Sequence, residues 1–235
     1  MAHKYLVVIP AYNEEETIEQ VIRLSQPYAD VCIVDDASTD ATPQILARLN
    51  GVHTIRHQKN THIAGAILDG MRYAVEAGYD FCITMDAGMS HDPKAIPDFK
   101  QQTSSDLVIG YRRKKMNVPF YRKALSLAGT TLINLALNRG RIFRRGPLLR
   151  DVTSGYRMYS RRALELLLRS DTKSRSFDFH LEALAFIYLN GMSVKEIPIT
   201  YVHSNSSLRL KVVGHALQTW WRIFTSSDFR ASAEA

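Results

Sequence analysis

The chain has 235 residues, of which 46% are hydrophobic and 23% are charged, and its 30 basic and 23 acidic side chains give a formal net charge of +7. This length suits one sizeable α/β core, and no linker-like stretch divides the chain into two independent domains. The N-terminus lacks a secretory signal, and Cys32 and Cys82 have neither zinc-like nor C-x-x-C spacing. We therefore expect a cytosolic protein with reduced thiols, not a secreted or disulfide-linked one.

The positive charge is concentrated in one segment. Residues 107–150 hold 11 of the 30 basic residues and no acidic residue, whereas the rest of the chain has 19 basic against 23 acidic residues. Because an ordinary solvated surface mixes both signs, this segment predicts an anionic partner: a phosphate, an anionic membrane surface or a nucleic acid. Nucleic acid is disfavoured, since the segment is interleaved with an aliphatic helix and offers few aromatic side chains for base stacking.

The first half of the chain alternates apolar runs with helical patterns, which predicts βαβ units in a mainly parallel sheet. We expect strands over 5–10, 31–34 and 81–85, and another over 107–109 that ends at Gly110. The expected helices begin at a capping-box-like Asn13–Glu16 pair, near Asp40, near Ile63, and at Asp92 with Pro93.

The first three strands each end in an acidic loop, reading PAYNEEE, DDASTD and DAGMSHDP. Ligands of open α/β sheets bind beyond the carboxyl ends of the strands, so these loops converge on one site. Carboxylates alone would repel a phosphate. The convergence of Asp35, Asp36 and Asp86 therefore predicts either a divalent cation that bridges to an anionic ligand, or polar recognition of a sugar or base.

The second half contains an apolar run over 124–137, too short to span a bilayer and suited to an interfacial or buried helix. Helices are expected over 164–168 and 181–189, and a late strand over 192–201 interrupted at Pro198. Residues 212–224 form an amphipathic stripe with two Trp and basic flanks. This stripe suits a membrane interface, and packing against the core or a second subunit suits it equally.

The ordered motifs PAYNEEE, VDDASTD, MDAGMSHDP, GYRR, DVTSGYRMY and VKEIPITY resemble those of family 2 glycosyltransferases with the GT-A fold, most closely the dolichol- or polyprenol-phosphate mannosyltransferases. The resemblance implies a GT-A domain over 1–207, whose basic segment 111–150 faces the acceptor and membrane, followed by a C-terminal helix and tail over 208–235. It implies inverting transfer of a hexose from a nucleotide-sugar to a polyprenyl phosphate at the cytosolic membrane face. GDP-mannose is the favoured donor, with UDP-glucose as an alternative.

The resemblance also assigns roles to individual residues. The residues that it implies for binding the donor are Pro10, Tyr12, Glu14, Asp35, Asp36, Asp86 and Ala87. Asp86 would hold Mg²⁺ or Mn²⁺ on the diphosphate, with Ser90, His91 or Asp92 as further support. The residues that it implies for binding the acceptor are Arg112, Arg122, Ser126 and Arg157. The catalytic residues that it implies are Asp86, Arg112 and Arg122.

Two departures from the family pattern fall in the site. Gly88 stands where the second carboxylate of D-A-D is usual, which lowers the expected metal affinity. In the late loop, Arg209 or Lys211 would have to replace the usual cations. A non-lipid acceptor, and a nucleotide-sugar-binding protein without transfer activity, therefore stay open as alternatives. For Asp178 and Glu182, a scaffold role is favoured over a catalytic one.

Overall fold

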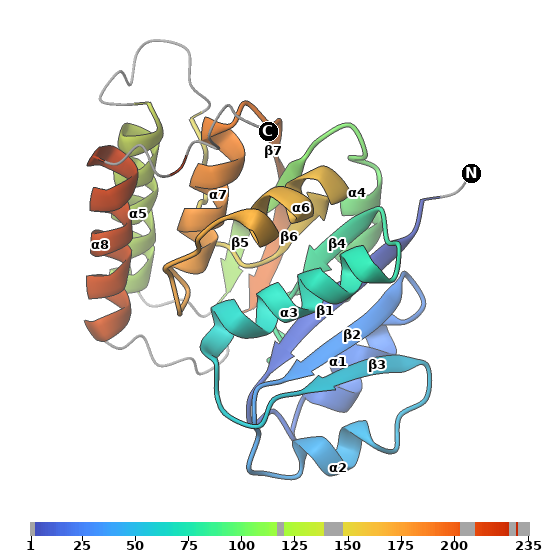
Figure 1. Ribbon diagram of the computed structural model, residues 1–235. Helices are drawn as coiled ribbons and strands as arrows, with labels where there is room; N and C mark the ends of the chain where they lie inside the picture. Colours follow the sequence, from blue (N-terminus) through green and yellow to red (C-terminus); the bar gives the residue numbers. More distant parts are fainter. Residues whose placement is uncertain (1–2, 117–119, 139–147, 203–209, 226–228, 230–235) are drawn as a thin grey trace.

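The computed structural model describes residues 3–116, 120–138, 148–202, 210–225 and 229. Their strands form one seven-stranded sheet in the order β3-β2-β1-β4-β6-β5-β7 (Figure 1). β6 runs antiparallel to both neighbours, and the other pairs are parallel. The expected α/β fold with a mixed, mainly parallel sheet is confirmed.

The strands are β1 (Tyr5–Ala11), β2 (Asp30–Asp35), β3 (Val52–Arg56), β4 (Phe81–Thr84), β5 (Leu107–Met116), β6 (Arg157–Ser160) and β7 (Val194–Val202). The helices are α1 (Ile18–Ser25), α2 (Thr42–Leu46), α3 (His62–Glu76), α4 (Ile96–Lys100), α5 (Phe120–Leu137), α6 (Arg161–Arg169), α7 (Phe179–Leu189) and α8 (Leu210–Thr225), with a short 3₁₀ helix over Pro93–Ala95. None of the helices in these described ranges is long and apolar enough to cross a bilayer.

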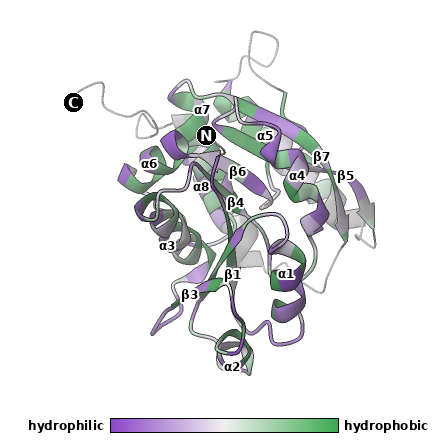
Figure 2. Ribbon diagram, turned by 90° about the vertical axis from the view of Figure 1, so that its right-hand side faces the viewer, coloured by the Kyte–Doolittle hydropathy of each residue, from purple (hydrophilic) through white to green (hydrophobic). Residues whose placement is uncertain are grey.

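The centre of the sheet consists of β2, β1 and β4, whose apolar runs are buried on both faces, as parallel strands covered by helices require. Figure 2 views the sheet from the side, with α3 and α6 on one face and α1 and α4 on the other. The approach of α3 to β1 is close at Gly70, where an added Cβ would lie 2.3 Å from Cγ1 of Val8. Glycine at this position therefore fixes the distance between helix and sheet.

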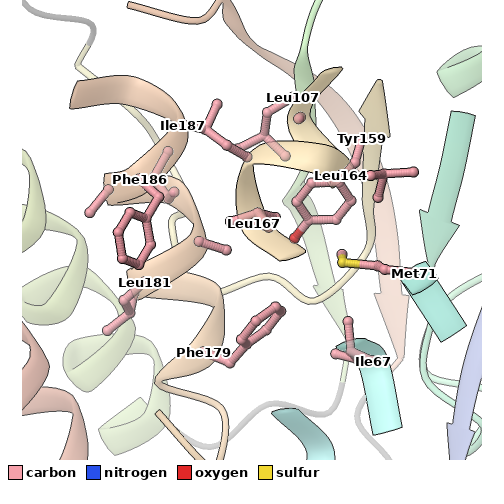
Figure 3. Packing of buried hydrophobic residues seen from close by; sticks show 14 of the residues in the cluster. Ile67, Met71, Leu107, Tyr159, Leu164, Leu167, Phe179, Leu181, Phe186 and Ile187 are labelled. Atoms are coloured by element: carbon pink, nitrogen blue, oxygen red, sulfur yellow. The ribbon is translucent and has the colours of Figure 1, made fainter. Parts of the chain in front are cut away.

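The larger core cluster lies between the sheet and α3, α6 and α7 (Figure 3). Ile67 and Met71 of α3 meet Leu164 and Leu167 of α6, and Phe179 begins the almost wholly buried α7. Helices α5 and α8 lie side by side at the outer end of this layer, where Nε1 of Trp220 donates to the carbonyl of Leu132 at 2.8 Å. Both elements were expected as helices, and α8 ends the described chain except for Phe229.

Three expectations about local structure are wrong. β5 does not end at Gly110 but continues to Met116, because its polar continuation pairs with β7 through Arg112 and Ile199. Pro198 does not interrupt β7, since β7 is an edge strand and its backbone needs a partner on one side only. Asn13 forms no capping box: α1 begins at Ile18, and Asn13 takes a φ of +57°.

Candidate active site

The acidic loops meet at one edge of the sheet, as expected. β2, β1 and β4 are neighbouring parallel strands, so the segments after Asp35, Ala11 and Thr84 leave the sheet in the same direction. The first two loops are joined by hydrogen bonds: the Asn13 amide donates to Oγ of Ser38 at 3.0 Å, and Oδ1 of Asn13 accepts from the Thr39 amide at 2.8 Å. The positive φ of Asn13 orients both groups toward the second loop.

Asp35 and Asp36 are both buried and engaged within this framework. Oδ1 of Asp35 accepts from the Ser38 amide at 2.9 Å, and its Oδ2 lies 3.5 Å from Nε of Arg56. Oδ1 of Asp36 accepts from the Thr61 amide at 2.7 Å and lies 2.8 Å from Nδ1 of His57. The two aspartates therefore organise the loops that surround the predicted donor side.

The other predicted donor residues differ in exposure. Pro10 pairs with Val34 inside the sheet, whereas the Tyr12 side chain is 48% exposed beyond the strand end. Glu14 is partly buried, and that burial, with smaller contributions from Asp86 and Asp40, raises the pKa of its carboxyl; a hydrogen bond from Thr17 opposes the shift. The charges of Glu14 and Asp86 are therefore close enough to act on one another.

Asp86 is the partly exposed carboxylate of the third loop, with 32% of its side chain accessible. Its amide donates to Nδ1 of His91 at 3.2 Å. The His91 ring is buried, and desolvation lowers its pKa, opposed by Asp86 and aided by Arg112. Ala87 and Ser90 are buried, and Asp92 caps the following 3₁₀ helix through the Lys94 amide, as its spacing with Pro93 predicts.

The basic strand β5 presents Arg112 near enough for the Asp86 charge to act on it. Nε and Nη2 of Arg112 contact the two carboxylate oxygens of Asp151 at 2.6 and 2.7 Å, and Nη2 also donates to Oγ of Ser126 at 3.2 Å and to the hydroxyl of Thr153. Burial alone would lower the Arg112 pKa, but the bonds and charge of Asp151 outweigh it and raise the pKa. The guanidinium also lies 5.2 Å from the centre of the Tyr201 ring.

The structure therefore brings Arg112 and Ser126 together, as the predicted acceptor set requires. Three predicted cations lie outside what the structure describes: the side chains of Arg122 and Lys211, and the whole of Arg209. Asp151, Thr153 and Tyr201 complete the Arg112 environment. Asp151 and Tyr201 both stood in recognisable motifs, but the sequence carried no signal that Tyr201 would contact Arg112, which depends on the pairing of β5 with β7.

Arg157 is not placed to contact an acceptor. Its side chain is fully buried, and it donates to the carbonyls of Ser154, His180 and Val152 at 2.8, 2.6 and 2.6 Å. These bonds hold the segment before β6 against the start of α7. Arg157 is thus a scaffold residue, and the prediction that it binds the acceptor is not retained.

Asp178 and Glu182 also act in the scaffold. Glu182 is buried, accepts from the Ser174 amide at 2.7 Å, and pairs with Arg222 of α8 at 2.9 Å. The favoured scaffold interpretation of this pair agrees with these contacts. Together they attach α8 to α7 across 40 residues of sequence.

The acidic edge fits a divalent cation only in part. Among the described residues, no group of three or more His, Cys, Asp or Glu side chains is arranged to hold a metal. Asp86 nevertheless offers one accessible carboxylate, and Mg²⁺ commonly binds through one or two carboxylates plus substrate phosphates. The donor set therefore fits a cation that a diphosphate would share.

Residues 6–168 match the family described as Glycosyl transferase family 2. The chain belongs to this family. It is a glycosyltransferase in which Asp86 belongs to the acidic loop edge and lies near Arg112. The resemblance stated from the motifs is thereby confirmed.

Curated relatives cover most of this glycosyltransferase. It is 32% identical to an undecaprenyl-phosphate mannosyltransferase of Micrococcus luteus over 91% of each chain. It is 30% identical to a UDP-N-acetylglucosamine–dolichyl-phosphate N-acetylglucosaminyltransferase of Methanococcus voltae, over 88% of this chain and 90% of the relative. A polyprenol monophosphomannose synthase of Mycolicibacterium smegmatis is 30% identical over 83% of this chain and 76% of the relative.

Solved structures agree on the fold. Glucosyl-3-phosphoglycerate synthase from Mycobacterium tuberculosis, in complex with Mn²⁺, UDP and phosphoglyceric acid, superposes with a TM-score of 0.71 at 18% identity, covering 96% of this chain and 80% of that one. The same enzyme with Mg²⁺ and UDP gives a TM-score of 0.69, covering 99% and 82%. At this identity the similarity establishes the GT-A-like fold alone.

Proposed function

We propose that this glycosyltransferase transfers a hexose from a nucleotide-sugar to a polyprenyl or dolichyl phosphate, with inversion at the anomeric carbon. The observation that carries the proposal is that Asp86 is near both predicted sites. It follows β4, which with its neighbours β1 and β2 leads into the acidic loops, and it is close enough to Arg112, which bonds Ser126, to help raise the Arg112 pKa. The names of three relatives, each specifying a lipid phosphate, support the same assignment.

On the donor side, Pro10, Tyr12, Glu14, Asp35, Asp36 and Ala87 would surround the nucleoside, and Asp86 would hold Mg²⁺ or Mn²⁺ with the diphosphate. Such a cation stabilises the negative charge that develops on the leaving nucleoside diphosphate, typically by several kcal/mol. The protein's part is to present the accessible carboxylate of Asp86 at the end of β4. GDP-mannose is the favoured donor, because two of the three relatives are named for mannose.

On the acceptor side, a lipid phosphate needs positioning more than deprotonation. Its second pKa is about 6, as for other phosphomonoesters, so its oxygens are already nucleophilic at neutral pH. Arg112 and Ser126 would orient it, with Arg122 as a further contact. The pairing of Arg112 with Asp151 fixes the direction of the guanidinium, since both carboxylate oxygens are engaged.

The exposed stripe of α5 and α8 would seat the enzyme on the cytosolic face of a membrane. Leu127, Leu217, Trp221 and Phe224 are 68%, 49%, 57% and 41% exposed. None of the exposed residues described on these two helices is an Asp, Glu, Lys or Arg. Basic residues of 113–115 and 139–150 flank α5 in the sequence, and Arg122 and Lys123 lie in its first turn. An uncharged apolar stripe with basic flanks matches an anionic membrane surface.

The membrane part of the proposal is tested by flotation with vesicles of phosphatidylglycerol and phosphatidylcholine. The double variant Trp221→Ser, Phe224→Ser should lose about ten-fold or more in partitioning, because each side chain gains about 1.5–3 kcal/mol on full burial. Leu24→Ser, at a 40% exposed position on α1, is the matched control and should float like the wild type. Equal flotation of all three proteins would refute this surface, and concentration-dependent dimerisation of the wild type alone would assign it to a second copy.

The transfer reaction is tested with labelled GDP-mannose and UDP-glucose, a polyprenyl phosphate in detergent, and Mn²⁺ or EDTA. Metal-dependent incorporation into the lipid from one donor is expected, with inverted anomeric configuration. Incorporation only into a soluble acceptor would favour a non-lipid substrate. Nucleotide binding without incorporation would favour the binding-protein alternative, which Gly88 in place of a second carboxylate makes worth testing.

A further inference from the structure

The loop after β4 turns back on its first residue. Met89 takes a φ of +56°, a conformation that L side chains rarely adopt, and this turn brings His91 next to Asp86. Nδ1 of His91 accepts the Asp86 amide at 3.2 Å and lies 3.6 Å from Oδ2 of the same residue. The imidazole thus holds the backbone of Asp86; because the same Nδ1 accepts the amide proton, it has no proton to give to the carboxylate beside it.

The His91 ring is itself fixed in place. Only 2% of its side chain is exposed, and it stacks on Tyr156 with ring centres 4.9 Å apart. The hydroxyl of Tyr156 donates to the carbonyl of Asp92 at 3.2 Å. The backbone of His91 also bridges to Tyr201 at the end of β7. An imidazole packed in this way cannot turn away from Asp86 without disturbing two other elements.

Asp86 is confined on its other side as well. The carbonyl of Gly155 accepts from the Thr84 hydroxyl at 2.8 Å, which holds Gly155 against the end of β4. A Cβ added at Gly155 would lie 3.4 Å from Oδ1 of Asp86 and 3.0 Å from Nε2 of the buried His180. The carboxylate therefore lies between His91 and the Gly155–His180 wall, with its accessible part directed to solvent.

We propose that His91 is a positioning residue that fixes the Asp86 backbone, and with it the point from which the carboxylate is presented, and so compensates for the missing carboxylate at Gly88. Two carboxylates can hold a cation even when each is mobile, whereas a single one binds well only if its orientation is set before the ligand arrives. The inference rests on the proposed role of Asp86 in holding a cation. It adds a residue and a physical reason for the departure from the family pattern.

Two substitutions separate the hydrogen bond that His91 accepts from the packing of its ring. His91→Asn retains an acceptor at the position of Nδ1 and loses the ring, whereas His91→Phe retains a ring against Tyr156 and loses the acceptor. The first measurement is hydrogen exchange of the Asp86 amide in metal-free protein. Exchange should be about five- to ten-fold faster in His91→Phe, the factor that one lost hydrogen bond implies, and close to wild type in His91→Asn.

The second measurement is Mn²⁺ binding, followed by electron paramagnetic resonance in the presence of UDP or GDP. Affinity should fall about five- to ten-fold in His91→Phe and stay within about two-fold in His91→Asn. His53→Phe is a matched control, because His53 also stacks on a tyrosine, Tyr73, at 3.7 Å, but lies on β3. It should leave both readouts unchanged.

A third variant tests the compensation directly. Gly88 is not among the glycines with positive φ, so an aspartate there avoids that source of backbone strain. Gly88→Asp in the His91→Phe background should restore Mn²⁺ affinity while the Asp86 amide still exchanges fast. Restoration of affinity without restoration of protection is the result that a purely structural role for His91 does not produce.

The outcomes separate this inference from the proposed function. Unchanged Mn²⁺ affinity in His91→Phe, or equal losses in His91→Phe and His91→Asn, would overturn it, as would a wild type that binds no Mn²⁺ beside a nucleoside diphosphate. Absence of sugar transfer to a lipid phosphate, with the expected Mn²⁺ differences retained, would refute the proposed acceptor and leave the positioning role of His91 standing.

Discussion

Arg112 and Asp151, 39 residues apart in the sequence, form a two-pronged ion pair at 2.6 and 2.7 Å with 16% and 4% of their side chains exposed. Asp151 also accepts the Arg112 amide at 3.1 Å, so one carboxylate fixes both the backbone and the side chain of the arginine. This arrangement orients the guanidinium toward Ser126 and Thr153.

Removal of this carboxylate should affect both stability and acceptor use. Asp151→Ala leaves the partly buried Arg112 charge without its carboxylate, which should lower the free energy of unfolding by up to about 3–5 kcal/mol, the loss typical of a fully buried pair. Urea denaturation measures this loss, and KM for the lipid phosphate should rise in the same variant. Glu165→Ala is the control: its pair with Arg161 is 41–42% exposed, so the loss should be below about 1 kcal/mol. Equal losses of unfolding free energy in the two variants would show that the Arg112–Asp151 pair contributes no more than an exposed pair does.

Asp86→Asn should abolish metal-dependent transfer, with a decrease in kcat of at least about 100-fold, because the cation that offsets charge on the leaving group loses its protein ligand. The fold should be unaffected, since the Asp86 side chain is 32% exposed. Transfer assays over a Mn²⁺ series, paired with thermal unfolding, measure both quantities. Full activity of the variant in EDTA would refute the proposed mechanism.

Arg157→Met should destabilise the protein by several kcal/mol, on the order of 3–5, because three buried carbonyls lose a charged donor. Arg157→Lys should lie between the wild type and the methionine variant, since an ammonium group cannot reproduce the fork of the guanidinium. Thermal and urea unfolding measure the series. A stable Arg157→Met protein with weakened acceptor binding would reinstate Arg157 as an acceptor ligand.

Stability should fall in mild acid because of His180. Desolvation by burial, with Arg157 and His91 adding to it, lowers the His180 pKa well below its usual value. Above pH about 6.5 both the folded and unfolded states carry a neutral ring; below it the unfolded state binds a proton that the folded state excludes. The free energy of unfolding therefore decreases, by up to about 1.4 kcal/mol per pH unit for this group.

The measurement is urea denaturation of the wild type and His180→Gln between pH 7.5 and 5.5. The variant is expected to be less stable at every pH, but its dependence on pH should be shallower, because glutamine does not titrate. Parallel curves for the two proteins would show that His180 does not contribute to acid destabilisation.

The sequence by itself determined the central part of this protein. Apolar runs at 5–10, 31–34 and 81–85 predicted β1, β2 and β4, and the acidic residues that follow them predicted where a ligand site would form. A local signal also succeeded in the Asp92 cap on the Lys94 amide, whereas the similar signal at Asn13 formed no capping box. These features follow from hydrophobic periodicity and short-range hydrogen bonding, which depend on neighbours in the chain.

Only the tertiary structure decided the rest. β3 is a largely exposed edge strand and β6 has four residues, so neither has a strong periodic pattern, and both exist because a neighbouring strand pairs with them. Arg157 resembles an acceptor ligand in the sequence, yet burial commits it to backbone carbonyls. The partners of Arg112 and Glu182 lie about 40 residues away. Long-range pairing of buried charges depends on which elements pack together, and no local pattern in the chain encodes it.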